Sequence, residues 1–266
     1  GIRDKEYSGQ PQSSVYRILA LGDSQTFGNG LELSETWPKQ LERILNRDLI
    51  DPRYEVINSG LPGSDTWQHE IILERMISKY NPNAVVLAFY VNDVQTSFKP
   101  KRTTSNTNNA LQTRIIYILK RSVLLLSLRA ALESIRGAIS PADINIQQRK
   151  LLSDPNNPSL DKRWQQVESS LSRMKAACDR KRIRFLISSL PRRDQVYGQL
   201  PWEGYQQRLQ TIASRYNISL ISMLEPLRDL HNTYGDKLFI PWDGHNSALD
   251  NDIIAKTIAD TLPKTD

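Results

Sequence analysis

The sequence lacks the features that mark several large classes of protein. Its 266 residues include a single cysteine, Cys178, which excludes an intrachain disulfide. No run of eighteen apolar residues occurs, so the sequence contains no candidate for a membrane-spanning helix. The charged fraction of 24% and the apolar fraction of 39% are those of an ordinary globular protein and argue against disorder. The length suits one large α/β domain.

Motifs for binding nucleotides, nucleic acids and metals are also missing. The first strand pattern is followed by Gly-Asp-Ser-Gln-Thr-Phe-Gly at 22–28 rather than by a G-x-G-x-x-G turn, which argues against a dinucleotide site. No zinc-finger, RNP or P-loop pattern accompanies the formal charge of +6, so we do not expect nucleic-acid binding. No cluster has the spacing of metal ligands, and we expect neither a metal nor another cofactor. The modest positive charge is compatible with anionic partners such as acidic glycans or phospholipid headgroups.

Strand-like and helix-like segments alternate over most of the chain. Strand patterns occur at 16–21, 54–57, 84–90, 183–188 and 218–221. Helical patterns occur at 37–49, 66–80, 161–181, 202–215 and 248–262. Strands that are joined by crossover helices predict a parallel sheet with helices on both faces.

Residues 95–160 interrupt this alternation, and we expect them to form a helical insertion within a single domain that spans 1–266. The insertion contains an apolar and basic segment, 111–139, in which Glu133 is the only acid. The simplest interpretation is a helical hairpin that packs on the core. The alternatives are a lid over the active site or a surface in peripheral contact with a membrane, for which a basic amphipathic helix is suited.

The first strand pattern ends at Gly22-Asp23-Ser24, and a turn or helix start follows. In an open α/β sheet, ligands bind just beyond the carboxyl ends of the strands. A serine hydroxyl at this place, flanked by small residues, is where a nucleophile is expected. We expect Asp23 to be structural and to accept hydrogen bonds from backbone donors of the turn.

A serine nucleophile needs a base, and the sequence has three histidines. His69 falls early in a helix without a neighbouring motif, and His231 ends an amphipathic stretch as a surface or helix-end residue does. His245 lies in a turn-rich loop before the last helix, two residues after Asp243. This spacing can direct both side chains the same way, so that the carboxylate fixes the tautomer of the imidazole. The alternative is that the polar residues of this loop serve only as turn and cap residues.

Four blocks of the sequence, in order, resemble those of the SGNH/GDSL hydrolase superfamily. They are Gly22-Asp23-Ser24, Asn58-Ser59-Gly60-Leu61-Pro62-Gly63, Val91-Asn92-Asp93 and Asp243-Gly244-His245. Trp37-Pro38 also resembles the usual opening of the family's first helix. The resemblance covers the whole chain apart from 95–160. It implies a three-layer α/β/α sandwich with a mainly parallel, flavodoxin-like sheet of five strands.

The resemblance also implies a role for each matching residue. Ser24 would be the nucleophile, His245 the general base and Asp243 its orienting partner. Three donors would form the oxyanion hole, namely the backbone N–H groups of Ser24 and Gly63 and the side-chain amide of Asn92. Glycine lets the backbone approach a substrate oxygen closely, and donors held in place at a developing oxyanion supply several kcal/mol.

The chain departs from the family pattern at three places. Gln25 stands where the family has leucine after Gly-Asp-Ser, and Val91 replaces the glycine that is common before the asparagine. Asp243 and His245 are separated by one residue rather than by the more usual two. In the second block we interpret Gly60 as a turn glycine.

Together these residues predict a serine esterase that acts on an ester-bearing small molecule, glycan or lipid through an acyl-serine. An O-acyltransferase for a cell-surface glycan would use the same residues, with a sugar hydroxyl in place of water. A non-catalytic binding module on the same fold would require a broken site, and no site residue is missing. Because the sequence begins with Gly-Ile-Arg rather than Met, we expect a periplasmic, secreted or formerly anchored protein.

Overall fold

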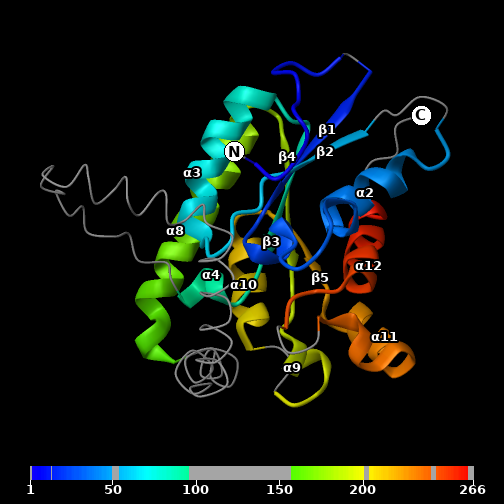
Figure 1. Cartoon of the computed structure of the whole chain (residues 1–266). Coiled ribbons are helices and arrows are strands. Elements are labelled where there is room, and N and C mark those ends of the chain that lie inside the picture. The colour runs from blue at the N-terminus through cyan, green and yellow to red at the C-terminus, as the bar shows by residue number, and fades with distance from the viewer. Residues whose placement is uncertain are drawn as a thin grey trace, which may run out of the picture. The chain divides into compact units, whose positions relative to one another are not determined.

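The computed structural model describes residues 2–12, 14–49, 54–95, 157–200, 204–240 and 244–262. These residues contain a sheet of five strands in the order β2-β1-β3-β4-β5, and all four pairings are parallel (Figure 1). The strands are β1 (Tyr16–Leu21), β2 (Tyr54–Asn58), β3 (Ala84–Phe89), β4 (Arg184–Ser189) and β5 (Ser219–Ser222). The predicted parallel sheet is confirmed, and each strand begins and ends within one residue of the predicted bounds.

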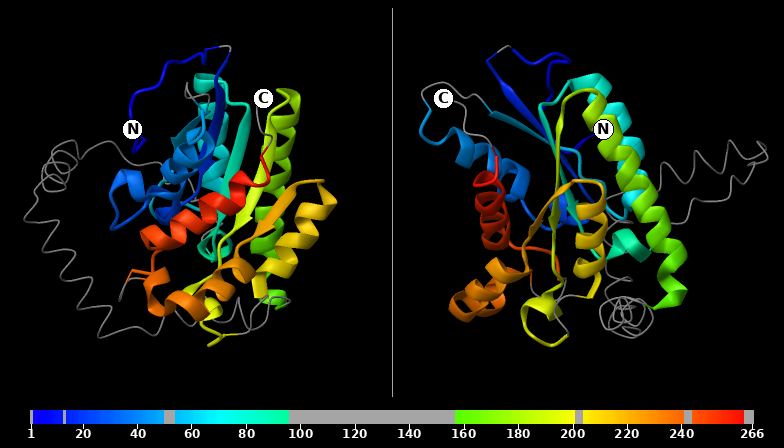
Figure 2. Two further views of the ribbon diagram at one scale, coloured as in Figure 1. Left: turned by 90° about the vertical axis from the view of Figure 1, so that its right-hand side faces the viewer. Right: turned by 180° about the vertical axis from the view of Figure 1, so that it is seen from behind.

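Helices cover both faces of the sheet, as the turned views in Figure 2 show. One face carries α3 (Thr66–Tyr80), α8 (Asp161–Arg180) and α10 (Gly204–Arg215). The other carries α2 (Trp37–Asn46), α11 (Leu224–Tyr234) and α12 (Ala248–Ala259). The side chains of β1 alternate between the two layers: Leu19 and Leu21 pack with the first group of helices, Ile18 and Ala20 with the second. Two separate apolar layers on one strand require cover on both sides, so the predicted three-layer sandwich is confirmed.

Side chains satisfy the outer edge of β2. The carboxylate of Asp4 accepts a hydrogen bond from the backbone N–H of Asn58 at 2.9 Å. Glu42 accepts from the N–H of Val56 at 2.7 Å, and Lys39 donates to the carbonyl of Val56 at 3.0 Å. These bonds occupy ladder groups that an edge strand otherwise offers to another chain.

Three short helices follow the carboxyl ends of strands: α1 (Ser24–Phe27), α4 (Asn92–Gln95) and α9 (Arg193–Val196). The sequence predicts a helix start only for the first of them, because one turn is too short to show a period of 3.6 residues. Single turns of 3-10 helix also occur, η1 (Leu33–Glu35), η2 (Pro158–Leu160) and η3 (Gly235–Leu238).

The structure does not describe residues 96–156, which make up all of the expected insertion at 95–160 except its two ends. The insertion and its amphipathic segment 111–139 therefore stay predictions. Among the helices that the structure describes, none is long and apolar enough to cross a membrane.

Candidate active site

Ser24 lies just beyond the carboxyl end of β1, at the first position of α1. Asp23 is the N-cap residue of this helix, and its Oδ1 accepts a hydrogen bond from the backbone N–H of Gln25 at 2.9 Å. The predicted structural role of Asp23 is thereby confirmed. The helix ends after one turn at Gly28, which has a left-handed φ of 81°. Ser24 is thus held at the rim of the sheet, and it is only partly buried.

The fold brings His245 to Ser24 across more than 200 residues of sequence. Nε2 of His245 lies 2.8 Å from Oγ of Ser24. The backbone around the imidazole is held on both sides: Ile240 donates its N–H to the carbonyl of His245 at 2.7 Å, and Asn246 donates its N–H to Oε1 of Gln25 at 3.0 Å. A serine hydroxyl and an imidazole at this distance have the geometry that acyl transfer through a serine requires.

Gln25 is buried, and its side chain connects the nucleophile helix to the histidine loop. A leucine at this position, which is the usual residue of the family, has no acceptor for the N–H of Asn246. Val91, the second departure, is fully buried in the apolar layer that contains α3 and α8. Asp243 lies outside the described residues, so its position beside His245 stays a prediction.

Asn92 is the first residue of α4, beyond the end of β3, and its side chain reaches the N-cap of α1. Nδ2 of Asn92 donates to Oδ2 of Asp23 at 2.6 Å. An amide nitrogen carries two hydrogens, so this bond uses one of them and fixes the direction of the other. Burial, with a further contribution from the nearby Asp93 carboxylate, raises the pKa of Asp23 to about 6.

The two glycines of the second block have different environments. Gly63 is exposed, has a left-handed φ of 73°, and has open space where a Cβ would lie. Gly60 packs against α1, because a Cβ there would lie 2.2 Å from the backbone nitrogen of Phe27. The reason for Gly60 is therefore close approach of two backbones rather than the turn conformation that we expected. Gly63 is the one whose backbone is accessible to a ligand.

The sequence gives no reason to place His69 in the site, yet in the structure His69 contacts the residues that follow Gly63 and Asn92. Nε2 of His69 lies 2.7 Å from Oγ of Ser64, and its Nδ1 lies 3.1 Å from Oδ1 of Asp93. All three side chains are buried. In the sequence, Ser64 comes directly after the second block and Asp93 is the last residue of the third. This is the signal that could have identified the group of His69, Ser64 and Asp93.

His231, the third histidine, is on α11 and is stacked on Tyr197, with 4.2 Å between the ring centroids. Its Nδ1 lies 3.3 Å from the carbonyl oxygen of Gly235, just after the helix. The prediction of a helix-end residue is confirmed.

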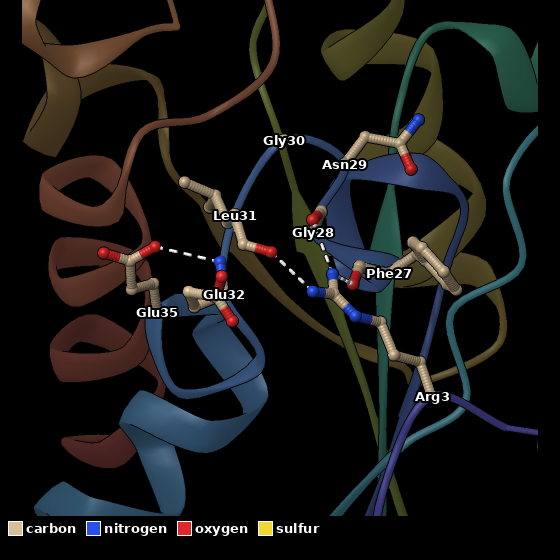
Figure 3. A pocket seen from close by; sticks show the side chains of 8 residues that line it. All are labelled: Arg3, Phe27, Gly28, Asn29, Gly30, Leu31, Glu32 and Glu35. Carbon is tan, nitrogen blue, oxygen red and sulfur yellow. Dashed lines mark hydrogen bonds between the residues drawn. The ribbon is translucent and has the colours of Figure 1, made fainter. Parts of the chain in front are cut away.

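A pocket of about 470 Å³ lies beside α1 (Figure 3). Its lining residues are Arg3, Phe27, Gly28, Asn29, Gly30, Leu31, Glu32 and Glu35. The guanidinium of Arg3 donates to the carbonyls of Phe27 at 2.8 Å and Gly28 at 2.6 Å. The N–H groups of Gly28 and Asn29 both donate to the carbonyl of Ser24, so one wall of the pocket is bonded to the backbone of Ser24.

Among the described residues, no group of three or more His, Cys, Asp or Glu side chains is arranged to hold a metal ion.

Comparisons with known proteins agree with this geometry. The model of the GDSL-like Lipase/Acylhydrolase family matches residues 20–242. An arylesterase of Vibrio mimicus is 30% identical over 90 residues, which are 34% of this chain and 44% of that protein. The match thus spans less than half the length of this relative.

Several solved structures have the same fold at low sequence identity. An acetyl xylan esterase, AlAXEase, is 14% identical with a TM-score of 0.58 over 93% of this chain and 100% of the other. TesA is 15% identical with a TM-score of 0.55 over 93% and 98%. A two-domain esterase active on acetylated mannans is 14% identical with a TM-score of 0.56 over 97% of this chain and 52% of the other.

The family match begins at Ala20, near the end of β1, includes Ser24, both glycines of the second block and Asn92, and ends at Trp242, just before Asp243 and His245. Because it extends over most of the sequence and the described residues have the matching fold, the chain belongs to the GDSL-like lipase/acylhydrolase family of ester-bond hydrolases.

Proposed function

We infer that the protein hydrolyses carboxylic esters with Ser24 as nucleophile and His245 as general base. The observation that carries this inference is the 2.8 Å distance between Oγ of Ser24 and Nε2 of His245 at the rim of the sheet. A serine hydroxyl is a weak nucleophile, and an imidazole within hydrogen-bond reach removes its proton as it attacks.

The reaction has two halves with the same proton carrier. Oγ of Ser24 forms a bond to the ester carbon while its proton passes to Nε2 of His245. The bond from carbon to the alcohol oxygen then breaks, and the alcohol leaves with that proton. Water next adds to the acyl-serine, gives a proton to His245, and expels Oγ, which takes the proton back.

The negative oxygen of each tetrahedral intermediate needs donors that are already in place. We assign this role to the backbone N–H groups of Ser24 and Gly63 and to Nδ2 of Asn92. The open space at Gly63 and the bond between Asn92 and Asp23 support the assignment. We assign to Asp243 the orientation of His245, on the basis of their spacing in the sequence.

For the substrate we propose a short-chain acyl ester of a carbohydrate. Two solved neighbours, an acetyl xylan esterase and an esterase active on acetylated mannans, support this class.

The test combines covalent labelling with turnover. A serine-reactive phosphonate is expected to label Ser24, and acetylated oligosaccharides are expected to release acetate in the presence of the protein. The Ser24→Ala variant should lose both the label and the release. Labelling at another residue, or turnover that survives the substitution, contradicts the assignment. Transfer of the acetyl group to a second sugar, in place of release, identifies an acyltransferase with the same nucleophile.

A further inference from the structure

We propose that His69 is a positioning residue that holds the two non-serine donors of the oxyanion hole, Gly63 and Asn92, in a fixed arrangement. This inference rests on the proposed function, because it concerns the donors assigned there. His69 touches neither donor itself. It contacts Ser64 and Asp93, each of which is the next residue along the chain from a donor.

The loop that carries Gly63 has few anchors of its own. Leu61 is 46% exposed, Gly63 is exposed, and open space lies where a Cβ of Gly63 would be. The N–H of Leu61 is bonded to the carbonyl of Gly22 at 2.9 Å. Beyond Gly63, the buried Ser64 is the first side chain that reaches into the protein, and His69 is its partner there. The direction of the Gly63 N–H therefore depends on the contact between Ser64 and His69.

The number of hydrogens on each side chain identifies the donor in the contact between Ser64 and His69. The hydroxyl of Ser64 lies 2.6 Å from the carbonyl of Leu61 and 3.4 Å from that of Gly22, and its only hydrogen points toward these acceptors, chiefly the nearer one. Oγ of Ser64 must then accept from Nε2 of His69, which lies 2.7 Å away. A serine that has given its hydrogen to a carbonyl is locked in one rotamer, and the turn from Leu61 to Ser64 is closed.

The other ring nitrogen of His69 faces the segment that carries Asn92. Nδ1 lies 3.1 Å from Oδ1 of Asp93, and the same carboxylate accepts from the backbone N–H of Tyr90 at 2.8 Å and from the hydroxyl of Thr66 at 3.1 Å. Asp93 is fully buried. One imidazole therefore joins the loop after β2 to the turn after β3, which are the two segments that provide Gly63 and Asn92.

Carboxylates surround His69 in the folded protein, and its Nδ1 lies within ion-pair distance of one of them. Burial lowers the pKa of His69, but the nearby carboxylates, Asp93 first among them, together outweigh this effect and leave the pKa raised. The charged groups that face it are Asp93, Asp23 on the N-cap of α1, and Asp65 at the start of its own helix. These carboxylates favour the protonated form of the ring, in a site that water does not reach.

This buried group is not a second catalytic centre. Ser64 is 1% exposed and His69 is 0% exposed, so no ester can reach the hydroxyl. The hydrogen of Ser64 is moreover bonded to a carbonyl and points away from the imidazole. The contacts of His69 can hold two segments in place, but the hydroxyl of Ser64 cannot attack a substrate.

The experiment compares His69→Phe and Ser64→Ala with the wild-type protein in ester turnover and in the affinity for a boronic acid that forms a tetrahedral adduct on Ser24. We expect kcat to fall about 10- to 100-fold with KM changed less than about threefold, since donors that are misplaced lose part of their effect. The affinity for the boronic acid should fall by a factor similar to that of kcat/KM. His69→Gln, which retains one donor toward Ser64, should recover part of the loss.

The matched control is Leu73→Ala, one turn further along the same helix and fully buried. It should lower the melting temperature, because it leaves a cavity in the apolar layer, and leave kcat within about twofold. The double variant Ser64→Ala/His69→Phe should be no slower than the slower single variant, because both act through one contact. If His69→Phe does not fold, Ser64→Ala alone decides.

Wild-type kcat in a folded His69→Phe or Ser64→Ala variant overturns the inference, as does an equal loss of kcat in Leu73→Ala. Loss of turnover with unchanged affinity for the boronic acid also overturns it. Failure of the proposed function gives a different result, because Ser24 would then not be labelled in the wild-type protein. The two failures are therefore distinguishable.

Discussion

Two serine–histidine pairs lie at the same end of the sheet, and they differ in what surrounds them. Oγ of Ser24 is 2.8 Å from Nε2 of His245, and Oγ of Ser64 is 2.7 Å from Nε2 of His69. The first pair is partly exposed at the rim, whereas the second is buried. The hydroxyl of Ser64 donates to the carbonyl of Leu61, so its imidazole has no proton to remove. Two nearly equal distances thus support different chemistry. Exposure to solvent and the direction of the serine hydroxyl hydrogen decide which pair can act on a substrate.

The largest effect that separates the two pairs is expected from alanine at each serine. Ser24→Ala should lower kcat/KM by about 10⁴-fold or more, because no other group forms the acyl intermediate. Ser64→Ala should lower it far less and cost about 1–3 kcal/mol of stability, since it leaves a buried imidazole N–H without its acceptor. Ester turnover and urea unfolding of both variants measure this difference. Equal losses of turnover would contradict the distinction between the pairs.

The next largest effect concerns Asp23, which lies between the two groups. Burial raises its pKa in the folded protein to about 6, against an ordinary value of 3.8, so the folded state binds the proton more tightly. Its stabilising contribution is complete below about pH 4 and is lost as the pH rises to about 6, on the order of 3 kcal/mol. Asp23→Asn should remove this slope, as measured by urea unfolding between pH 4 and 7. Asp48→Asn, at an exposed side chain, is the control that should keep it.

A third test contrasts Asp93, which faces His69, with a buried carboxyl that faces no charged group. Asp250 on α12 is fully buried, burial raises its pKa well above the usual value, and neither oxygen has a hydrogen-bond partner among the described residues. Asp250→Asn should stabilise the protein at pH 7 by about 2 kcal/mol, because the charged form is the costly one. The gain should shrink toward pH 4, where about half of the unfolded chains also carry the protonated carboxyl.

Asp93→Asn should have the opposite sign, since it removes the partner of His69. Thermal unfolding of both variants at pH 4 and pH 7 gives the two signs. A stabilising Asp93→Asn, or an Asp250→Asn that is neutral at both pH values, would refute the contrast.

The smallest expected effect concerns the pair of Ser24 and His245. It comes from a change at Gln25, which stands where the family has leucine. Gln25→Leu removes the acceptor for the N–H of Asn246, next to His245. We expect about a tenfold lower kcat, since an unmade buried hydrogen bond costs about 1–3 kcal/mol and loosens the histidine loop. Asn46→Ala is the control, because it breaks two hydrogen bonds to Tyr54 at the amino end of β2 and should reduce stability without lowering kcat. Unchanged kcat in a folded Gln25→Leu variant would show that the loop of His245 keeps its position without the hydrogen bond from Asn246 to Gln25.

Much of the fold is predictable from local pattern. The apolar run at β1 and the continuous run at β3 identify strands that are covered on both faces, and crossover helices between them require parallel pairing. Ser24, Asn92 and Gly63 are predictable as site residues because each follows a strand or stands in a block that resembles the family. The short helices α1 and α4 are less visible, because their caps rather than their periodicity define them.

The sequence by itself determined the order of the strands and helices and the presence of a serine and a histidine in matching blocks. The tertiary structure decided which side chains meet. It placed His245 rather than His69 at Ser24, packed Gly60 against the backbone of α1, and joined His69 to Ser64 and Asp93. The physical reason is that these contacts depend on burial and on the direction of single hydrogens, which form only when distant segments pack together.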